Sequence, residues 1–324
     1  MNFKSIAAIA TLLNLANIAA ATAQDYPNRP IRIVVPQAAG GATDVIARVI
    51  ADRLSPRLRQ QLVIDNKPGA GGNIAAAGVA RAAPDGYTLL LANHPGITTA
   101  PSISKSPGFD PVKDFSAISM LAKQTMLLTV HPTIPVTNIA EFVSYARARP
   151  GALSYATPGI GSPHHLAMEL FKQMSGVDLL HIPYKGGAPA MQDVVAGQVP
   201  VMFGSFVIAG PYIRAGRLRA IGASGATRNT QAPEYLTIAE QGYPGFSQEA
   251  WFGLVAPVGT ANSAIERLNQ EISVVLANTD LQQQLIRTGF DPIPAMSVVE
   301  FSRIYISDVT QWSKVVRDAK ILPE

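Results

Sequence analysis

Short runs of branched and aromatic residues alternate along this chain with longer segments that carry apolar residues at helical spacing. The strand-like runs lie at residues 31–35, 61–65, 87–92, 126–130, 153–157, 179–184, 199–203 and 218–223. Between them, segments such as 45–54 and 166–171 repeat apolar residues every three or four positions. Strands that alternate with helices of this kind predict an α/β fold with a mostly parallel sheet.

The α/β pattern occurs twice, over about residues 26–126 and again over about residues 127–249. After a further run at 249–257 the pattern is helical to the end of the chain. A chain of 324 residues is too long for one small core and fits two domains. We therefore expect two α/β units joined by two close strands or turns, with the terminal helices packed against an existing sheet.

The N-terminus has the pattern of a secretory signal peptide over residues 1–23. Lys4 precedes an apolar stretch, and Ala21-Thr22-Ala23 matches the small-residue cleavage pattern. A membrane anchor is the alternative, but the stretch is short and is interrupted by Asn14 and Asn17. No later segment approaches about 18 consecutive apolar residues, so we predict no transmembrane helix.

The composition excludes several classes of function. The chain has no cysteine, which rules out disulfides, thiolate metal sites, a cysteine nucleophile and a lipoprotein anchor. Loss of the signal peptide removes one lysine and no acid, which lowers the net charge from +4 to +3. No dense basic block accompanies this charge, so we expect no nucleic-acid partner. A small anionic ligand is compatible with it.

The turn at residues 36–44 is the first candidate site. It joins a strand end to a helix start, where free backbone N–H groups and the helix dipole attract an anion. Gly40 and Gly41 permit unusual φ angles and close approach of a ligand, and Thr43 offers a cap and a hydroxyl. The alternative is a tight βα turn with no ligand.

Two further glycine-rich turns follow. Gly69 and Gly71 give part of a dinucleotide fingerprint, but Ile74 stands where a third glycine is needed. Residues 157–163 repeat the chemistry of the first turn in the second α/β unit, with Pro163 at a favoured first helical position. A cleft between two such sheets would bring both anion-binding turns to one ligand.

The sequence gives little support for a catalytic site or a metal site. His164 and His165 are adjacent and lack the H-x-x-x-H spacing of a metal site, so a histidine that orients the ligand loop is favoured. Ser162 and Ser205 are outside any G-x-S-x-G motif, and no carboxylate pair suggests acid–base catalysis. We predict no catalytic residue, no metal and no cofactor. The pair at 251–252 is assigned to the core in preference to the cleft.

The motifs "YPNRPIRIVVPQAAGGATD", "NKPGAGGNIAAAGVARAAPDGYTLL", "PGALSYATPGIGSPHHLAMELF" and "HIPYKGGAPAMQDVVAGQV" occur in this order. With "DFSAI", "AGRLRAI" and "EAWFGLVAP", they resemble the Bug (TctC-like) family of extracytoplasmic solute-binding proteins, which are receptors of tripartite tricarboxylate transporters. The resemblance extends from about Tyr26 to the C-terminus. It implies a two-lobed periplasmic binding protein fold, type II-like, that closes like a Venus flytrap over a ligand in the inter-lobe cleft.

The resemblance also implies the domain boundaries and the site. Lobe 1 would contain residues 26–126 and 250–324, and lobe 2 residues 127–249. Two loops would hold a ligand carboxylate, largely through backbone N–H groups and water. Gln37 departs from the family, which usually has an aromatic residue there. The predicted ligand-binding residues are Gln37, Ala38, Ala39, Gly40, Gly41, Thr43, Asp44, Asn73, Thr157, Gly159, Gly161, Ser162, His165 and Tyr184.

The sequence therefore predicts a monomeric, non-enzymatic receptor, released into the periplasm by cleavage near Ala23. It would bind a small organic carboxylate, such as a dicarboxylate, a tricarboxylate or an aromatic carboxylate, and deliver it to the membrane subunits of a transporter. Two alternatives stay open: a binding protein that serves a signalling partner, and, less favoured, a nucleotide-dependent enzyme that uses the Gly69 turn.

Overall fold

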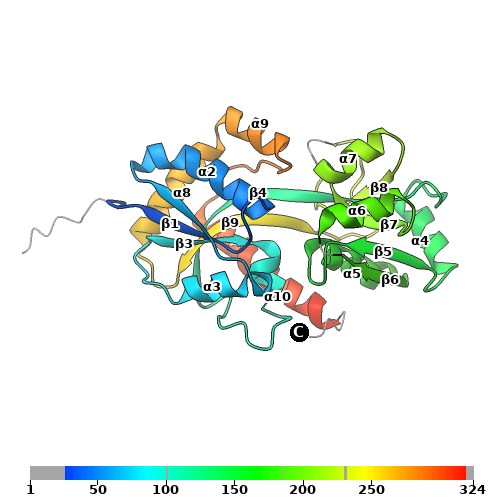
Figure 1. Ribbon diagram of the computed structural model, residues 1–324, viewed down its shortest axis with the longest axis horizontal. Coiled ribbons are helices and arrows are strands. Elements are labelled where there is room, and N and C mark those ends of the chain that lie inside the picture. The colour runs from blue at the N-terminus through cyan, green and yellow to red at the C-terminus, as the bar shows by residue number, and fades with distance from the viewer. Residues whose placement is uncertain (1–25, 100, 185, 230–231, 319–324) are drawn as a thin grey trace, which may run out of the picture.

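The computed structural model describes residues 26–99, 101–184, 186–229 and 232–318. Within them, two lobes lie side by side and share a nine-stranded sheet (Figure 1). The predicted signal peptide and its cleavage position lie outside the described residues, as do residues 319–324. Among the described residues, no helix combines the length and apolar character that a membrane crossing requires.

The first lobe is built on five strands in the order β2-β1-β3-β9-β4. β1 (Ile31–Val35) pairs in parallel with β2 (Leu62–Asn66) and with β3 (Thr88–Asn93). β9 (Glu249–Pro257) lies antiparallel between β3 and the first part of β4 (Phe115–Val130). A segment from late in the chain thus sits in the middle of the sheet.

Alternating side chains explain why both faces of this sheet are covered. Ile31 and Ile33 of β1 join a core with α2 (Ala42–Leu58), α8 (Asn262–Leu276) and α9 (Thr279–Arg287). Val34, on the opposite face, joins α3 (Asn73–Ala80) and α10 (Val298–Asp318). Successive side chains of a strand point to opposite faces of the sheet. The side chains of a continuous apolar run are therefore buried on both faces.

The second lobe continues the same sheet through the end of β4. β4 leaves β9 at Thr125, and from Met126 onward it pairs with β7 (Val201–Ser205) and β8 (Arg219–Ala223). β7 is followed by β5 (Leu153–Thr157) and β6 (Leu179–Pro183). Four helices complete this lobe: α4 (Ile139–Arg147), α5 (Pro163–Ser175), α6 (Gly187–Val195) and α7 (Phe206–Arg214).

The sheet is mixed, so the prediction of a mostly parallel sheet is wrong. β1 and β5 make parallel pairs with their neighbours, but every pair made by β4 or β9 is antiparallel. These two strands run between the lobes (Figure 1). The predicted strand at 126–130 is only the last part of β4, whose residues 115–125 were not predicted as strand.

Helix α10 contributes to the cores of both lobes. Phe301 and Tyr305 pack with the first lobe, whereas Trp312 packs with the second. Gly253 of β9 makes room for the helix, because a Cβ there would lie 2.5 Å from Phe301 Cζ. The two lobes are therefore joined by β4, β9 and a helix.

Candidate functional site

A cavity of about 370 Å³ lies where the two lobes meet. Its floor is formed by neighbouring strands, since Asn93 of β3 pairs with Phe252 of β9, and Ala250 pairs with Gln124 of β4. The loops that follow β1 and β5 form its walls. This position, beyond the carboxyl ends of parallel strands, is where open α/β sheets place their ligands.

The first wall is the turn between β1 and α2. Gly40 has a φ of +84°, as the glycine-rich turn predicts. Gly41 has an ordinary φ of −73°, so it does not use the backbone freedom that glycine permits. Its small size matters instead, because a Cβ would lie 3.3 Å from Ala38 O and 3.4 Å from Gln37 Oε1.

Thr43 differs from its predicted role as a helix cap. Gly41 is the N-cap of α2 and has no side chain to cap with, while Thr43 lies inside the first turn and is fully buried. The Thr43 hydroxyl donates to Gln37 Oε1 at 2.7 Å and accepts from Asn93 Nδ2 at 3.1 Å. Its single hydrogen is thus already used within the protein.

Not all of the N–H groups in this turn are available to a ligand. Gly40 N donates to Asp44 Oδ2 at 2.9 Å, and Gly41 N donates to Ala38 O at 3.2 Å. The N–H groups of Ala42 and Thr43 make no hydrogen bond within the described residues, and both residues line the cavity. The first turn of α2 therefore offers donors to the cavity in place of the two glycines.

Asp44 braces the turn from behind and does not line the cavity. It is buried, and it accepts hydrogen bonds from Arg48, Gly40 and Asn66. The hydrogen bond from Arg48 is the largest cause that lowers the pKa of Asp44 to about 2. The carboxylate is thus ionised at neutral pH and balanced by a guanidinium on the next turn.

The second wall is the loop between β5 and α5. Ser162 caps α5 by accepting from His165 N at 3.3 Å, and Pro163 occupies the first turn as predicted. Gly161 N donates to His165 Nδ1 at 3.1 Å, and Gly159 N to Thr157 Oγ1 at 3.3 Å. Within the described residues, the Ser162 hydroxyl has no acceptor, so its hydrogen is available to a ligand.

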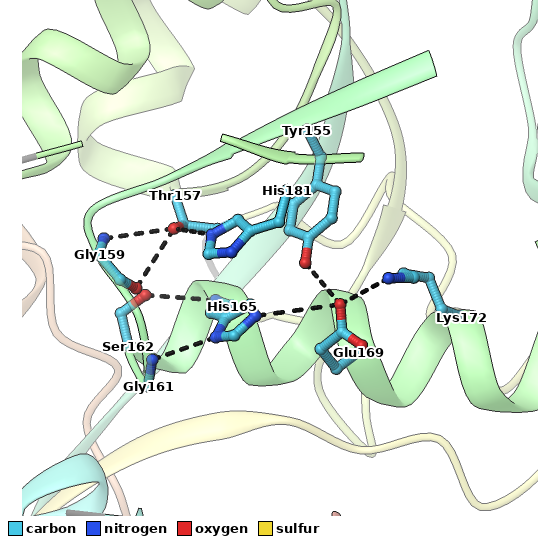
Figure 2. A network of polar contacts seen from close by, with 9 residues as sticks. All are labelled: Tyr155, Thr157, Gly159, Gly161, Ser162, His165, Glu169, Lys172 and His181. Atoms are coloured by element: carbon cyan, nitrogen blue, oxygen red, sulfur yellow. Dashed lines mark hydrogen bonds and ion pairs between the residues drawn. The ribbon is translucent and has the colours of Figure 1, made fainter. Parts of the chain in front are cut away.

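A stacked polar network supports this loop from behind (Figure 2). The rings of His165 and His181 lie 4.0 Å apart at 10°, and His181 Nε2 is 2.6 Å from Thr157 Oγ1. Glu169 accepts from Tyr155 at 2.6 Å and from Lys172 at 2.8 Å.

Burial keeps these histidines neutral. It lowers the pKa of His165, and it lowers the pKa of His181 to about 4. Because Gly161 N–H donates to Nδ1, neutral His165 carries its proton on Nε2, which lies 3.9 Å from Glu169 Oε1. His165 therefore holds the loop, as predicted for a histidine at this helix start.

The two walls approach each other across the cavity. A Cβ on Gly161 would lie 2.8 Å from Cδ1 of Ile103, which comes from the first lobe. Gly161 also has a φ of +71°, which favours glycine. An added Cβ would therefore meet the end of the Ile103 side chain on a backbone conformation that already favours glycine.

Among the described residues, the cavity lining contains no lysine, arginine, aspartate or glutamate. His164 lines the cavity, and burial lowers its pKa to about 4, so its ring is neutral at neutral pH. His164 Nδ1 is buried and has no hydrogen-bond partner among the described residues. Those residues also contain no group of three His, Cys, Asp or Glu side chains placed to hold a metal ion.

Five of the predicted site residues line the cavity: Gln37, Thr43, Gly159, Gly161 and Ser162. The others lie behind the walls or beside the cavity: Ala38, Ala39, Gly40, Gly41, Asp44, Asn73, Thr157, His165 and Tyr184. Tyr184 holds the second wall from outside, since its N–H donates to Thr157 O at 2.9 Å and its hydroxyl to Asp193 at 2.6 Å.

Sequence reasoning missed most of the floor. Trp251 is core, as expected, but Phe252 lines the cavity while being buried. The lining residues that were not predicted as site residues are Ala42, Gly71, Asn93, Ile103, Gln124, Pro158, Ile160, Pro163, His164, Ala250 and Phe252. Asn93 gave the clearest available signal, as a polar residue at the end of a buried strand.

Comparison with known proteins agrees with this geometry. Residues 46–321 match the model of the tripartite tricarboxylate transporter family receptor, TctC. The chain belongs to this family. TctC proteins are solute-binding receptors and not enzymes, and their solved members share this two-lobed α/β fold.

Three solved TctC-like structures illustrate the match. Rpa4515 of R. palustris, solved with adipate, is 37% identical with a TM-score of 0.77, covering 93% of this chain and 100% of that one. The periplasmic binding protein BugD is 34% identical with a TM-score of 0.73, covering 92% and 100%. MatC of Rhodopseudomonas palustris, solved with malate, is 33% identical with a TM-score of 0.73, covering 90% and 100%.

Proposed function

We propose that this TctC-family receptor captures a small organic carboxylate in the cavity between its lobes. The observation that carries the proposal is the convergence of two helix starts, α2 and α5, on a cavity whose described lining residues carry no lysine, arginine, aspartate or glutamate. N–H groups of a helix start and a serine hydroxyl bind an anion by charge-assisted hydrogen bonds. Two solved relatives, one with adipate and one with bound malate, support a carboxylate ligand.

We further propose how the receptor is organised and where it acts. Residues 26–126 and 250–324 would form one lobe and residues 127–249 the other, closing over the ligand. The signal peptide would be removed near Ala23, leaving a periplasmic monomer that delivers its ligand to the membrane subunits of a tripartite tricarboxylate transporter. N-terminal sequencing of the secreted protein should begin close to Gln24.

Thermal unfolding with separate ligands tests the proposal. A bound carboxylate at one hundred times its Kd should stabilise the protein by about 2.7 kcal/mol, whereas NAD should give no shift. A rise in melting temperature with NAD, and none with hexanedioate (adipate), malate or any other carboxylate, would favour a nucleotide-binding protein instead.

Ser162→Ala tests the placement of the site. It removes a hydroxyl that faces the cavity, so we expect about tenfold weaker carboxylate binding, the usual effect of losing a hydrogen bond to a charged group. It also removes the cap of α5, which costs about 1 kcal/mol of stability. The matched control is Ser144→Ala on the exposed surface of α4. Equal affinity in the two variants would place the carboxylate elsewhere.

A further inference from the structure

A chain of hydrogen bonds runs from the backbone of Gly96 to the side chain of Gln37. Gly96 N donates to Asn93 Oδ1 at 3.2 Å, and Asn93 Nδ2 donates to Thr43 Oγ1 at 3.1 Å. The Thr43 hydroxyl then donates to Gln37 Oε1 at 2.7 Å. The series therefore begins at a main-chain amide of the first lobe and ends at the cavity wall.

The backbone amide fixes the direction of every bond in this series. An N–H group only donates, so Asn93 must accept through Oδ1 and donate through Nδ2. Thr43 then has one hydrogen left, for Gln37 Oε1. The Nε2 group of Gln37 keeps both hydrogens and makes no hydrogen bond within the described residues. Since Gln37 lines the cavity, it presents a donor there.

The series is held rigidly. Thr43 is fully buried and Asn93 nearly so, which shields their hydrogen bonds from water. A Cβ on Gly96 would lie 2.5 Å from Asn93 Oδ1, so only glycine leaves that oxygen in place. The donor at Gln37 is thus oriented in advance of binding.

Gln124, in the floor of the same cavity, presents a group of the opposite polarity. Its Nε2 donates to the carbonyl oxygen of Gly289 at 3.2 Å, and a carbonyl only accepts. The orientation of this amide is therefore also fixed. Its Oε1 accepts no hydrogen bond from the described residues, and Gln124 is one of the residues that line the cavity. Gln124 thus presents an acceptor.

We infer that the cavity selects a singly charged carboxylate that carries a neutral hydroxyl or amide group. This inference rests on the proposed function and specifies its ligand class. Such a group accepts from Gln37 and donates to Gln124. An alkyl end would leave both amides without a partner. A second carboxylate would meet the Gln124 oxygen with like polarity, and no cation among the described lining residues would balance its charge.

A six-carbon series tests the preference by isothermal titration calorimetry on the mature chain. The probes are hexanoate, the hydroxyhexanoates with the hydroxyl at carbons 2 to 6, the monoamide of hexanedioate, and hexanedioate itself. We expect the best hydroxy acid or the monoamide to bind at least about tenfold tighter than hexanoate and hexanedioate. Hexanoate or hexanedioate binding as tightly as that best probe overturns this inference but keeps the proposed function. No binding by any carboxylate overturns both.

Variants separate a specificity role from a structural one. Gln37→Leu and Gln124→Leu should each reduce the affinity ratio between the best neutral-group probe and hexanoate to near one. Gln198→Leu, at an exposed turn, is the matched control and should leave the ratio unchanged. If Gln37→Leu and Gln124→Leu weaken the binding of all probes but leave the ratio unchanged, these amides only support the shape of the cavity. That result would overturn their role in selecting the ligand.

Thr43 and Gly96 test the positioning of Gln37. Thr43→Val keeps the shape but removes the hydroxyl, so the ratio should fall, whereas Thr43→Ser should restore it. Gly96→Ala acts from outside the cavity lining and should lower the ratio in the same way, with folding checked by circular dichroism. An unchanged ratio in folded Thr43→Val protein would overturn the role of the hydrogen-bond series.

Discussion

Replacing Asp308 with asparagine is expected to stabilise the protein at neutral pH. Asp308 lies on α10, where its carboxylate accepts from Trp251 Nε1 of β9. The pKa of Asp308 is raised to about 6, chiefly by burial and to a smaller extent by the charge of Glu249. The hydrogen bond from Trp251 and the charge of Lys123 oppose this increase. The side chain is thus an acid that the folded state holds more readily in its neutral form.

The sign and the size of this stabilisation follow from the linkage between protonation of Asp308 and folding. An acid whose folded pKa is raised contributes stability that is complete below its unfolded pKa and is lost as the pH rises through the folded value. A rise from 3.8 to about 6 corresponds to about 3 kcal/mol, at about 1.36 kcal/mol per pKa unit. Because water reaches part of this half-buried side chain, we expect about 1–2 kcal/mol.

Asparagine keeps the acceptor for Trp251 and removes the charge. Asp308→Asn should therefore be more stable than the wild type by about 1–2 kcal/mol at pH 8. The gain should shrink as the pH falls from 6 to 4. Urea unfolding followed by circular dichroism measures it, since fluorescence would respond directly to the change beside Trp251.

A control of opposite sign comes from Asp44, whose pKa is lowered to about 2. Asp44→Asn should lose about 1 kcal/mol at pH 8, since its partner Arg48 is half-exposed and water screens the pair. That loss should vanish as the pH falls from 4 to 2. A stability difference for Asp308→Asn that is the same at pH 4 and pH 8, or a loss at pH 8, would refute the reasoning.

Three further predictions concern the second wall and the lobe junction. Gly161→Ala should weaken hexanedioate binding in calorimetry and cost about 1–2 kcal/mol of stability, because its φ is +71° and a Cβ would press on Ile103. The affinity of the wild type for hexanedioate should stay level between pH 6 and 8, because burial lowers the pKa of His165 and so keeps its ring neutral. A tenfold change in affinity in that interval would contradict this. Gly253→Ala should lower stability by about 2–3 kcal/mol in thermal unfolding, because Phe301 has no room to move.

Local patterns predicted much of the fold because they act over a few residues. The apolar run of β1 and the helical spacing in α2 each follow from the burial of one segment. The first part of β4 escaped prediction because Ser116, Ser119 and Lys123 interrupt its apolar pattern. Its strand conformation depends on pairing with β9, which lies more than one hundred residues further along the chain.

The same limit applies to the site. The glycine-rich walls were predictable, because a strand end, a turn and a helix start are local features. The floor was not, because Asn93 and Gln124 come together only when β9 inserts between β3 and β4. Gly96, which orients the Asn93 amide, is only three residues away, but Asn93 then acts on Thr43, 50 residues earlier in the chain. The Gln124 amide is oriented by Gly289, 165 residues further along the chain, and no local pattern reveals either long-range contact.

In the described part of the chain, charged residues stand behind each wall and do not line the cavity. Asp44, paired with Arg48, holds the N–H of Gly40, and Glu169, paired with Lys172, lies beside the histidine that holds the second loop. These charges shape the walls without contacting the space between them. A receptor built in this way can change its ligand by exchanging neutral side chains such as Gln37, because the groups that hold the two helix starts in place remain the same. We therefore expect substitutions at Gln37 and Gln124 to alter which carboxylate binds, and substitutions at Asp44 and Glu169 to weaken all carboxylates together.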